Sequence, residues 1–196
     1  MFGANDACLQ GAAGSQHVPL SQYKKNIIDI IDHPAVKRQK PRIILVTPPP
    51  INEYMCEEND RAKGYFEPRR SAEHTKLYVD VVREIAQTHG IALLDLWLCF
   101  MKHAGWKEGD AALAGSKKME PNAFLRMLLH DGTCITSHLY WLQDSPCVSG
   151  FADTKPRPAF HKRSLYVVLP RNYAHDRKGL AGSDAREVAV RLSYVE

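Results

Sequence analysis

Residues 42–50, RIILVTPPP, decide the fold class of this chain. Residues 43–46 form an uninterrupted apolar run rich in β-branched side chains, and three prolines follow it closely. An apolar run of this length, bounded by turn residues, is typical of a strand buried on both faces of a parallel sheet. We therefore expect a fully buried strand over residues 43–46.

The segment before this strand has the periodicity of a helix. Ser21 is its expected N-cap. Pro34 ends the helix after His33, because a residue that precedes proline avoids helical backbone. The apolar side chains of residues 18–32 fall at helical spacing: Leu20, Tyr23, Ile27, Ile30 and Ile31.

The segments after the strand continue the alternation. Residues 51–70 are polar and irregular, which predicts a long surface loop. Residues 71–90 predict a second helix, with Ser71 as N-cap and Gly90 just past its end. The expected apolar stripe of this helix is Leu77, Val81, Val82 and Ile85.

Two further elements complete the pattern. Residues 91–97, IALLDLW, predict a second buried strand. Pro121 is expected to open a short helix or turn that runs to His130. Residues 1–132 therefore predict an α/β fold in which helices cover a parallel sheet.

Residues 133–196 differ from the preceding part of the chain, because their apolar residues follow no sustained helix or strand periodicity. Within them, residues 164–169 and 187–195 are strand candidates. We expect this tail to be either disordered or a hairpin, and we place the domain boundary between residues 132 and 133.

The parallel sheet predicts where a ligand would bind. In open α/β sheets, ligands bind beyond the carboxyl ends of the strands. The polar loops GAND (3–6), TPPP (47–50) and HDG (130–132) each follow or flank such an end. We expect these three loops to converge on one edge of the sheet.

Composition excludes several classes of protein. The formal net charge is only +4, and charged residues make up 24% of the chain, which does not indicate binding to nucleic acid or to an acidic membrane. No apolar run approaches the ~18 residues of a membrane-spanning helix, and no signal peptide is visible, so we expect a cytoplasmic protein. The five cysteines are scattered and lack C-x-x-C spacing, which favours free thiols and no metal site: Cys8, Cys56, Cys99, Cys134 and Cys147.

Several motifs in order give the chain a resemblance to a known family. They are FGAND (2–6), HVPLSQYKKNI (17–27), ILVTPPPINE (44–53), TKLYVDVVREIAQTHGIALLDLW (75–97) and LLHDG (128–132). Together they resemble the SGNH, or GDSL-type, hydrolases, and within them the isoamyl-acetate-hydrolysing esterase branch. The resemblance covers residues 1–132.

The resemblance implies a fold and an activity. The fold is a three-layer α/β/α sheet of flavodoxin-like kind, of which the first two strands would precede Met1. The activity is hydrolysis of small carboxylic esters without a cofactor. The family uses a serine in a Gly-Asp-Ser motif, an oxyanion hole that includes the asparagine of Gly-x-Asn-Asp, and a later Asp-x-x-His that completes the triad.

Carried over residue by residue, the resemblance names candidate site residues. Gly3, Asn5 and Asp6 match the Gly-x-Asn-Asp block, so Asn5 would donate to the oxyanion. Asp131 matches the triad acid, which orients a histidine so that it can take the serine proton. Position 134 should then be histidine, but it is Cys134. The Gly-Asp-Ser block is absent.

Two missing parts of the triad predict a chain that is inactive or nearly so. We expect a partial gene product that starts at an internal methionine and departs from the family just after Gly132. His138 is an unsuitable substitute, because four extended residues span up to ~13 Å. Cys134 lacks a visible activating base, and Ser15 is more simply a loop residue.

Alternatives remain for the residues and for the chain. Asn5-Asp6 can be an ordinary turn, Asp131 a surface Asp-Gly turn, and His130 a surface residue. The chain can be a non-catalytic α/β module that binds a partner through its tail. A flavodoxin-like nucleotide binder is disfavoured, because no glycine-rich phosphate loop follows a strand. The oligomeric state is not determined by the sequence.

Overall fold

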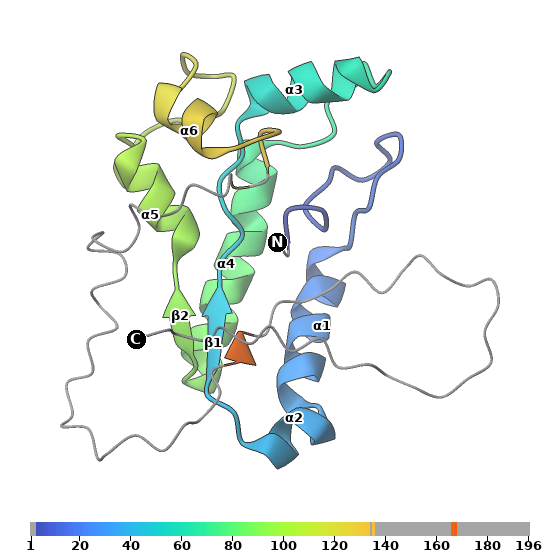
Figure 1. Cartoon of the computed structure of the whole chain (residues 1–196), viewed down its shortest axis with the longest axis vertical. Coiled ribbons are helices and arrows are strands. Elements are labelled where there is room, and N and C mark those ends of the chain that lie inside the picture. Colours follow the sequence, from blue (N-terminus) through green and yellow to red (C-terminus); the bar gives the residue numbers. More distant parts are fainter. Residues whose placement is uncertain (1–2, 134, 136–165, 168–196) are drawn as a thin grey trace, which may run out of the picture.

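The computed structural model describes residues 3–133, 135 and 166–167 (Figure 1). Helices and strands alternate through most of this range. In chain order the elements are α1 (Leu20–Asp32), α2 (Pro34–Gln39), β1 (Ile43–Val46), α3 (Glu53–Ala62), α4 (Ala72–His89), β2 (Ala92–Leu94), α5 (Leu96–His103), α6 (Ala123–Leu128) and β3 (Tyr166–Val167).

The strands form a parallel sheet in the order β2-β1-β3. Ile44 of β1 lies opposite Ala92 of β2 and opposite Val167 of β3. α1 packs against α4, and α4 contacts both β1 and β2 (Figure 1). The predicted α/β class with a parallel sheet is confirmed.

The strand over residues 43–46 is confirmed, but its burial is less complete than predicted. Only Leu45 is fully buried. Successive side chains of a strand point to opposite faces. Ile43 and Leu45 accordingly join the cluster around α1 and α4, whereas Val46 packs against a second cluster around α5 and α6.

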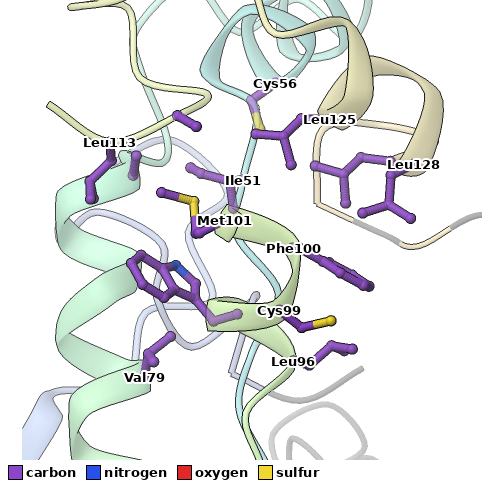
Figure 2. Packing of buried hydrophobic residues seen from close by; sticks show 14 residues of the cluster. Ile51, Cys56, Val79, Leu96, Cys99, Phe100, Met101, Leu113, Leu125 and Leu128 are labelled. Atoms are coloured by element: carbon purple, nitrogen blue, oxygen red, sulfur yellow. The ribbon is translucent and has the colours of Figure 1, made fainter. Parts of the chain in front are cut away.

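The second cluster is built around α5 and brings together residues of α4, α5 and α6 and of the segment after β1 (Figure 2). Phe100 and Met101 of α5 are completely buried in it. Leu125 of α6 and Ile51, which follows the prolines, pack against them. This cluster holds the loop after β1 in place.

The first helix starts differently from the prediction. Its N-cap is Pro19, and no side chain caps it, so Ser21 lies inside the helix and the predicted cap is wrong. Proline at this position fixes φ near the value that the chain needs on entering a helix. The end at His33 is confirmed, and a further short helix, α2, follows directly after it.

Both ends of α4 are as predicted, and its buried face is predicted in part. Ser71 accepts a hydrogen bond from His74 N, and Gly90 has left-handed backbone. The predicted stripe is wrong at Leu77, which is 46% exposed. Val82 and Ile85 are buried as predicted, and Val81 is partly buried. Tyr78, Val79 and Ala86 complete the buried face.

Residues 53–62 form helix α3, so the predicted surface loop is wrong there. Only Cys56 and Asp60 are buried in this helix, and it therefore lacks the apolar periodicity that would reveal it. Its stability comes from polar contacts. The Asn52 side chain caps it by accepting from Tyr54 N and Met55 N.

The second strand is shorter than predicted. It ends at Leu94, and the Asp95 side chain caps α5 by accepting from Leu98 N. Leu96 and Trp97 therefore belong to a helix and not to a strand. An aspartate favours a helix N-cap over a strand interior, so DLW is the start of an element that the apolar pattern hides.

The later elements complete the comparison. α6 starts one residue after Asn122, its N-cap, and Pro121 lies just outside the helix. Of the two predicted tail strands, the first is confirmed at β3, where it pairs with β1. Residues 187–195 lie outside the described residues, and the boundary after residue 132 stays a prediction.

Candidate active site

Three loops meet at the carboxyl end of β1, as the sequence predicts. A Cβ on Gly3 would lie 2.4 Å from Pro48 Cγ, so the first loop packs directly on the prolines. Asn52 N donates a 2.9 Å hydrogen bond to Gly132 O, which joins the third loop to the same segment. The segment of residues 48–52 therefore contacts the first loop through Pro48 and the third loop through Asn52 (Figure 1).

The first loop is a compact turn that fixes Gly3 and exposes Asn5. Ala7 N donates to Gly3 O, and Cys8 N donates to Asn5 O. Gly3 has a φ of 91°, and a side chain there would also meet the Tyr23 hydroxyl at 2.8 Å. Glycine is therefore required at this position for both backbone and space. The turn leaves the Asn5 side chain at the surface.

Asp6 is buried beneath this turn. Its Oδ2 accepts a 3.1 Å hydrogen bond from Gly3 N. Burial raises the pKa of the Asp6 carboxyl, although hydrogen bonds from backbone amides act in the opposite direction. Asp6 therefore closes the turn from inside and is not available to a ligand.

Arg70 is the contact of Asn5 that the sequence did not reveal. Its Nη2 donates a 3.1 Å hydrogen bond to Asn5 Oδ1, and its Nε makes a longer contact of 3.5 Å with Ala4 O. Arg70 lies 65 residues from Asn5 in the chain. The sequence offered one signal for this residue. Arg70 directly precedes Ser71, the predicted N-cap of a helix, and that cap fixes the backbone position from which the arginine side chain extends.

Asp131 lies in a tight turn on the amino-terminal end of α3. Its Oδ1 accepts from Thr133 N at 2.9 Å and from Thr133 Oγ1 at 2.8 Å. Gly132 has a φ of 82°, and a Cβ there would lie 2.7 Å from both Asn52 O and Cys56 N. This packing sets the position of the partly exposed Asp131 carboxylate, while its role as a triad acid stays a prediction.

The pKa of the buried Cys56 thiol is shifted by charges from both loops of the site, those of Arg70 and Asp131. Burial raises its pKa to about 12, the charge of Arg70 lowers it, and the charge of Asp131 is one of those that raise it further. Arg70 and Asp131 therefore both lie within electrostatic range of Cys56. A thiol held protonated in this way does not act as a nucleophile.

The remaining candidates fall into two groups. Ser15 Oγ donates to Leu9 O and accepts from His17 N, so its interpretation as a loop residue is confirmed. His130 is exposed. Cys134 and His138 lie outside the described residues.

Other predicted features concern the described part of the chain as a whole. Cys8, Cys56 and Cys99 are buried. Between residues 3 and 133, and at 135, 166 and 167, no three His, Cys, Asp or Glu side chains are grouped so that they could hold a metal ion. No helix of this part is long and apolar enough to cross a membrane.

The fold and its loops define an α/β protein in which an exposed asparagine, Asn5, and a carboxylate, Asp131, lie in loops that meet beyond the end of β1. Comparison with known proteins narrows this class of protein. No family model matches the chain. It is 37% identical to a GDSL esterase/lipase of Arabidopsis thaliana over 112 residues, which are 54% of this chain and 45% of that protein. It is 35% identical to the isoamyl acetate-hydrolyzing esterase 1 homolog of Rattus norvegicus over 102 residues, 52% of this chain and 41% of that protein.

The chain thus resembles GDSL-type esterases over about half of its own length. It spans less than half the length of these two relatives. Among solved structures, a lipase/acylhydrolase from Enterococcus faecalis aligns with 72% of this chain and 53% of its own, at 22% identity and a TM-score of 0.44.

Proposed function

We propose that residues 1–132 carry the oxyanion donor and the triad acid of an SGNH-type hydrolase of small carboxylic esters. The observation that supports this most directly is the shared anchoring of the two loops. The Gly3–Asp6 turn packs on Pro48, and the Asp131–Gly132 turn is bonded to Asn52. Two turns that flank one short segment can act on one substrate.

The residue types suit the chemistry of ester hydrolysis. An oxyanion that develops on the ester carbonyl needs preorganised donors, and an asparagine amide supplies N–H groups with no pKa to manage. A carboxylate such as Asp131 can hold a histidine in the tautomer that accepts the serine proton. The name of the rat relative specifies isoamyl acetate, which supports short acyl esters as the substrate class.

We further propose that the 196-residue chain by itself turns over such esters at close to the uncatalysed rate. No Gly-Asp-Ser occurs in it, and Cys134 stands where the triad histidine is expected. Without a nucleophile and the base that activates it, no acyl-enzyme can form, so the chain lacks the covalent route to hydrolysis.

A direct assay tests this second proposal. Hydrolysis of p-nitrophenyl acetate and butyrate is measured for the chain, for Asn5→Ala and for Asp131→Ala. We expect all three to match the rate without protein. Robust turnover that both substitutions abolish would show that the chain is an active enzyme.

Complementation tests the assignment of the site. The Gly-Asp-Ser-containing amino-terminal segment of a GDSL relative is fused before Met1, in a chain that carries Cys134→His. We expect turnover in this fusion, and a loss of about 100-fold or more in kcat on Asn5→Ala, as for other oxyanion donors. Asp131→Ala should abolish most of the rate.

Matched controls separate these losses from general damage. Asn26 and Asp29 are surface residues of α1 that bond Gln22 and Lys25. Asn26→Ala and Asp29→Ala should leave the rate of the active fusion unchanged. A fusion that turns over esters regardless of Asn5 and Asp131 would overturn the proposed site.

A further inference from the structure

An asparagine can serve as an oxyanion donor only if it presents the correct end of its amide. The Nδ2 group donates, whereas Oδ1 accepts and would repel a developing negative charge. The two ends have nearly the same shape, so the neighbours of an asparagine decide which end faces the substrate. Asn5 is exposed, and burial therefore does not restrain its amide.

Arg70 provides this restraint. A guanidinium has five N–H donors and no acceptor, so the atom of Asn5 that faces it must be the oxygen. The 3.1 Å bond from Arg70 Nη2 to Asn5 Oδ1 therefore turns Asn5 Nδ2 away from the arginine. We propose that Arg70 is the positioning residue that presents the Asn5 amide nitrogen to the oxyanion, an inference that rests on the proposed function.

The backbone of Arg70 is fixed on both sides. Leu9 N donates to Arg69 O, and the Arg69 guanidinium is bonded to Asp60 and to Gly14 O. After Arg70, Ser71 caps α4. A long side chain that starts from a fixed backbone loses less conformational entropy when its guanidinium is bound.

The positive charge of Arg70 also favours the role of Asn5 as a hydrogen-bond donor. Its hydrogen-bond partners within residues 3–133 are Asn5 and Ala4, and no carboxylate of that range forms an ion pair with it. Its positive charge is therefore not neutralised by an adjacent carboxylate. A hydrogen bond from a charged donor also polarises the Asn5 amide, which makes its N–H groups better donors.

Nuclear magnetic resonance of the full 196-residue chain tests this without any need for turnover. The Asn5 side-chain amide is identified as the NH2 pair that disappears in Asn5→Asp. Its chemical shifts and its nuclear Overhauser contacts are then measured in the unsubstituted chain, in Arg70→Met and in Arg70→Lys. Met retains most of the aliphatic stem and removes every donor, whereas Lys retains the charge.

In the unsubstituted chain we expect one amide orientation. In Arg70→Met the ratio of the two orientations should fall by about 10-fold or more, the equivalent of losing a hydrogen bond from a charged group. Arg70→Lys should restore part of this ratio. Arg126→Met is the control, because Arg126 contacts Glu58 on the surface of α3.

The backbone spectrum shows whether each variant remains folded, and Arg70→Lys carries the test if Arg70→Met does not fold. Asn5 signals that are identical in the unsubstituted chain and in a folded Arg70 variant overturn the inference. The proposed function is overturned by a different result, namely a complemented fusion that does not depend on Asn5.

Discussion

Asp6 shows how a single side chain in the site responds to folding. The residue is 7% exposed, and burial raises the pKa of its carboxyl above the ordinary value of 3.8. The folded state therefore binds this proton more tightly than the unfolded state does. The stabilisation linked to the proton is complete below 3.8 and is lost as the pH rises through the raised pKa.

This sign predicts the behaviour of Asp6→Asn. The amide oxygen of the variant can still accept from Gly3 N, but it carries no charge to desolvate. We expect the variant to be more stable than the original chain at neutral pH, and the difference to shrink as the pH falls towards 3.8. Urea unfolding across this pH range measures it.

Asp6→Ala separates the charge from the hydrogen bond. It leaves Gly3 N without its acceptor and should be less stable than Asp6→Asn by about 1 kcal/mol at every pH. A gain for Asp6→Asn that does not change with pH would contradict the account based on ionisation.

Gly132 predicts a large cost for adding one methyl group. Its φ is 82°, and a Cβ would lie within 2.8 Å of three atoms of Asn52 and Cys56, two of which are backbone. Left-handed backbone and overpacking together should cost about 3 kcal/mol in Gly132→Ala. Gly64 has almost the same φ, 84°, but open space around it, so Gly64→Ala should cost about 1 kcal/mol.

Thermal or urea unfolding of the two alanine variants checks this difference. If both substitutions cost the same, the backbone angle alone would account for Gly132, and its packing on α3 would not matter to the position of Asp131.

At the scale of residues, motif order indicated Asn5 and Asp131, and it did not indicate Arg70. A motif is a local pattern, whereas the bond between Arg70 and Asn5 joins positions 65 residues apart. Such a contact depends on where α4 starts relative to the first loop. The physical chemistry of arginine becomes informative only after that arrangement is known.

At the scale of elements, α3 was hidden because its stabilising contacts are polar. Glu57 and Arg61 form an i,i+4 ion pair on it, and Asn52 caps it. Such contacts stabilise a helix without an apolar stripe. By contrast, β1 and the ends of α4 were predictable, because apolar runs and caps such as Ser71 are local signals.

Glu53 in the first turn of α3 joins three segments. Its Oε1 accepts from Ala72 N at the start of α4, and its Oε2 accepts from Lys117 N. The first bond satisfies one of the amide groups that a helix start leaves without a partner. We expect Glu53→Ala to reduce the free energy of unfolding by about 2 kcal/mol, since both amides lose a charged acceptor.

The free energy of unfolding of Glu53→Gln should lie between those of the original chain and of Glu53→Ala, because an amide offers one acceptor oxygen in place of two. Glu58→Ala is the matched control on the same helix, where an exposed pair with Arg126 should contribute less than ~0.5 kcal/mol. Equal losses at Glu53 and Glu58, measured by urea unfolding, would contradict a joining role for Glu53.

At the scale of the whole molecule, the sheet order follows from pairing that no local pattern specifies. The sequence predicts that residues 164–169 can be a strand, and the structure shows that Tyr166–Val167 pairs in parallel with β1, over 100 residues earlier. β1 consequently has a partner on each side. A strand with an unpaired edge is prone to associate with other chains.

This pairing predicts the effect of Val167→Pro. Proline has no backbone N–H and a fixed φ, so it is poorly tolerated in a strand that pairs along its edge. We expect the variant to free one edge of β1 and to associate with itself as its concentration rises. Light scattering and size-exclusion chromatography over a range of concentrations measure this association. Val167→Ala retains the backbone N–H and should behave like the original chain, whereas association of both variants to the same extent would show that the edge of β1 is not the cause.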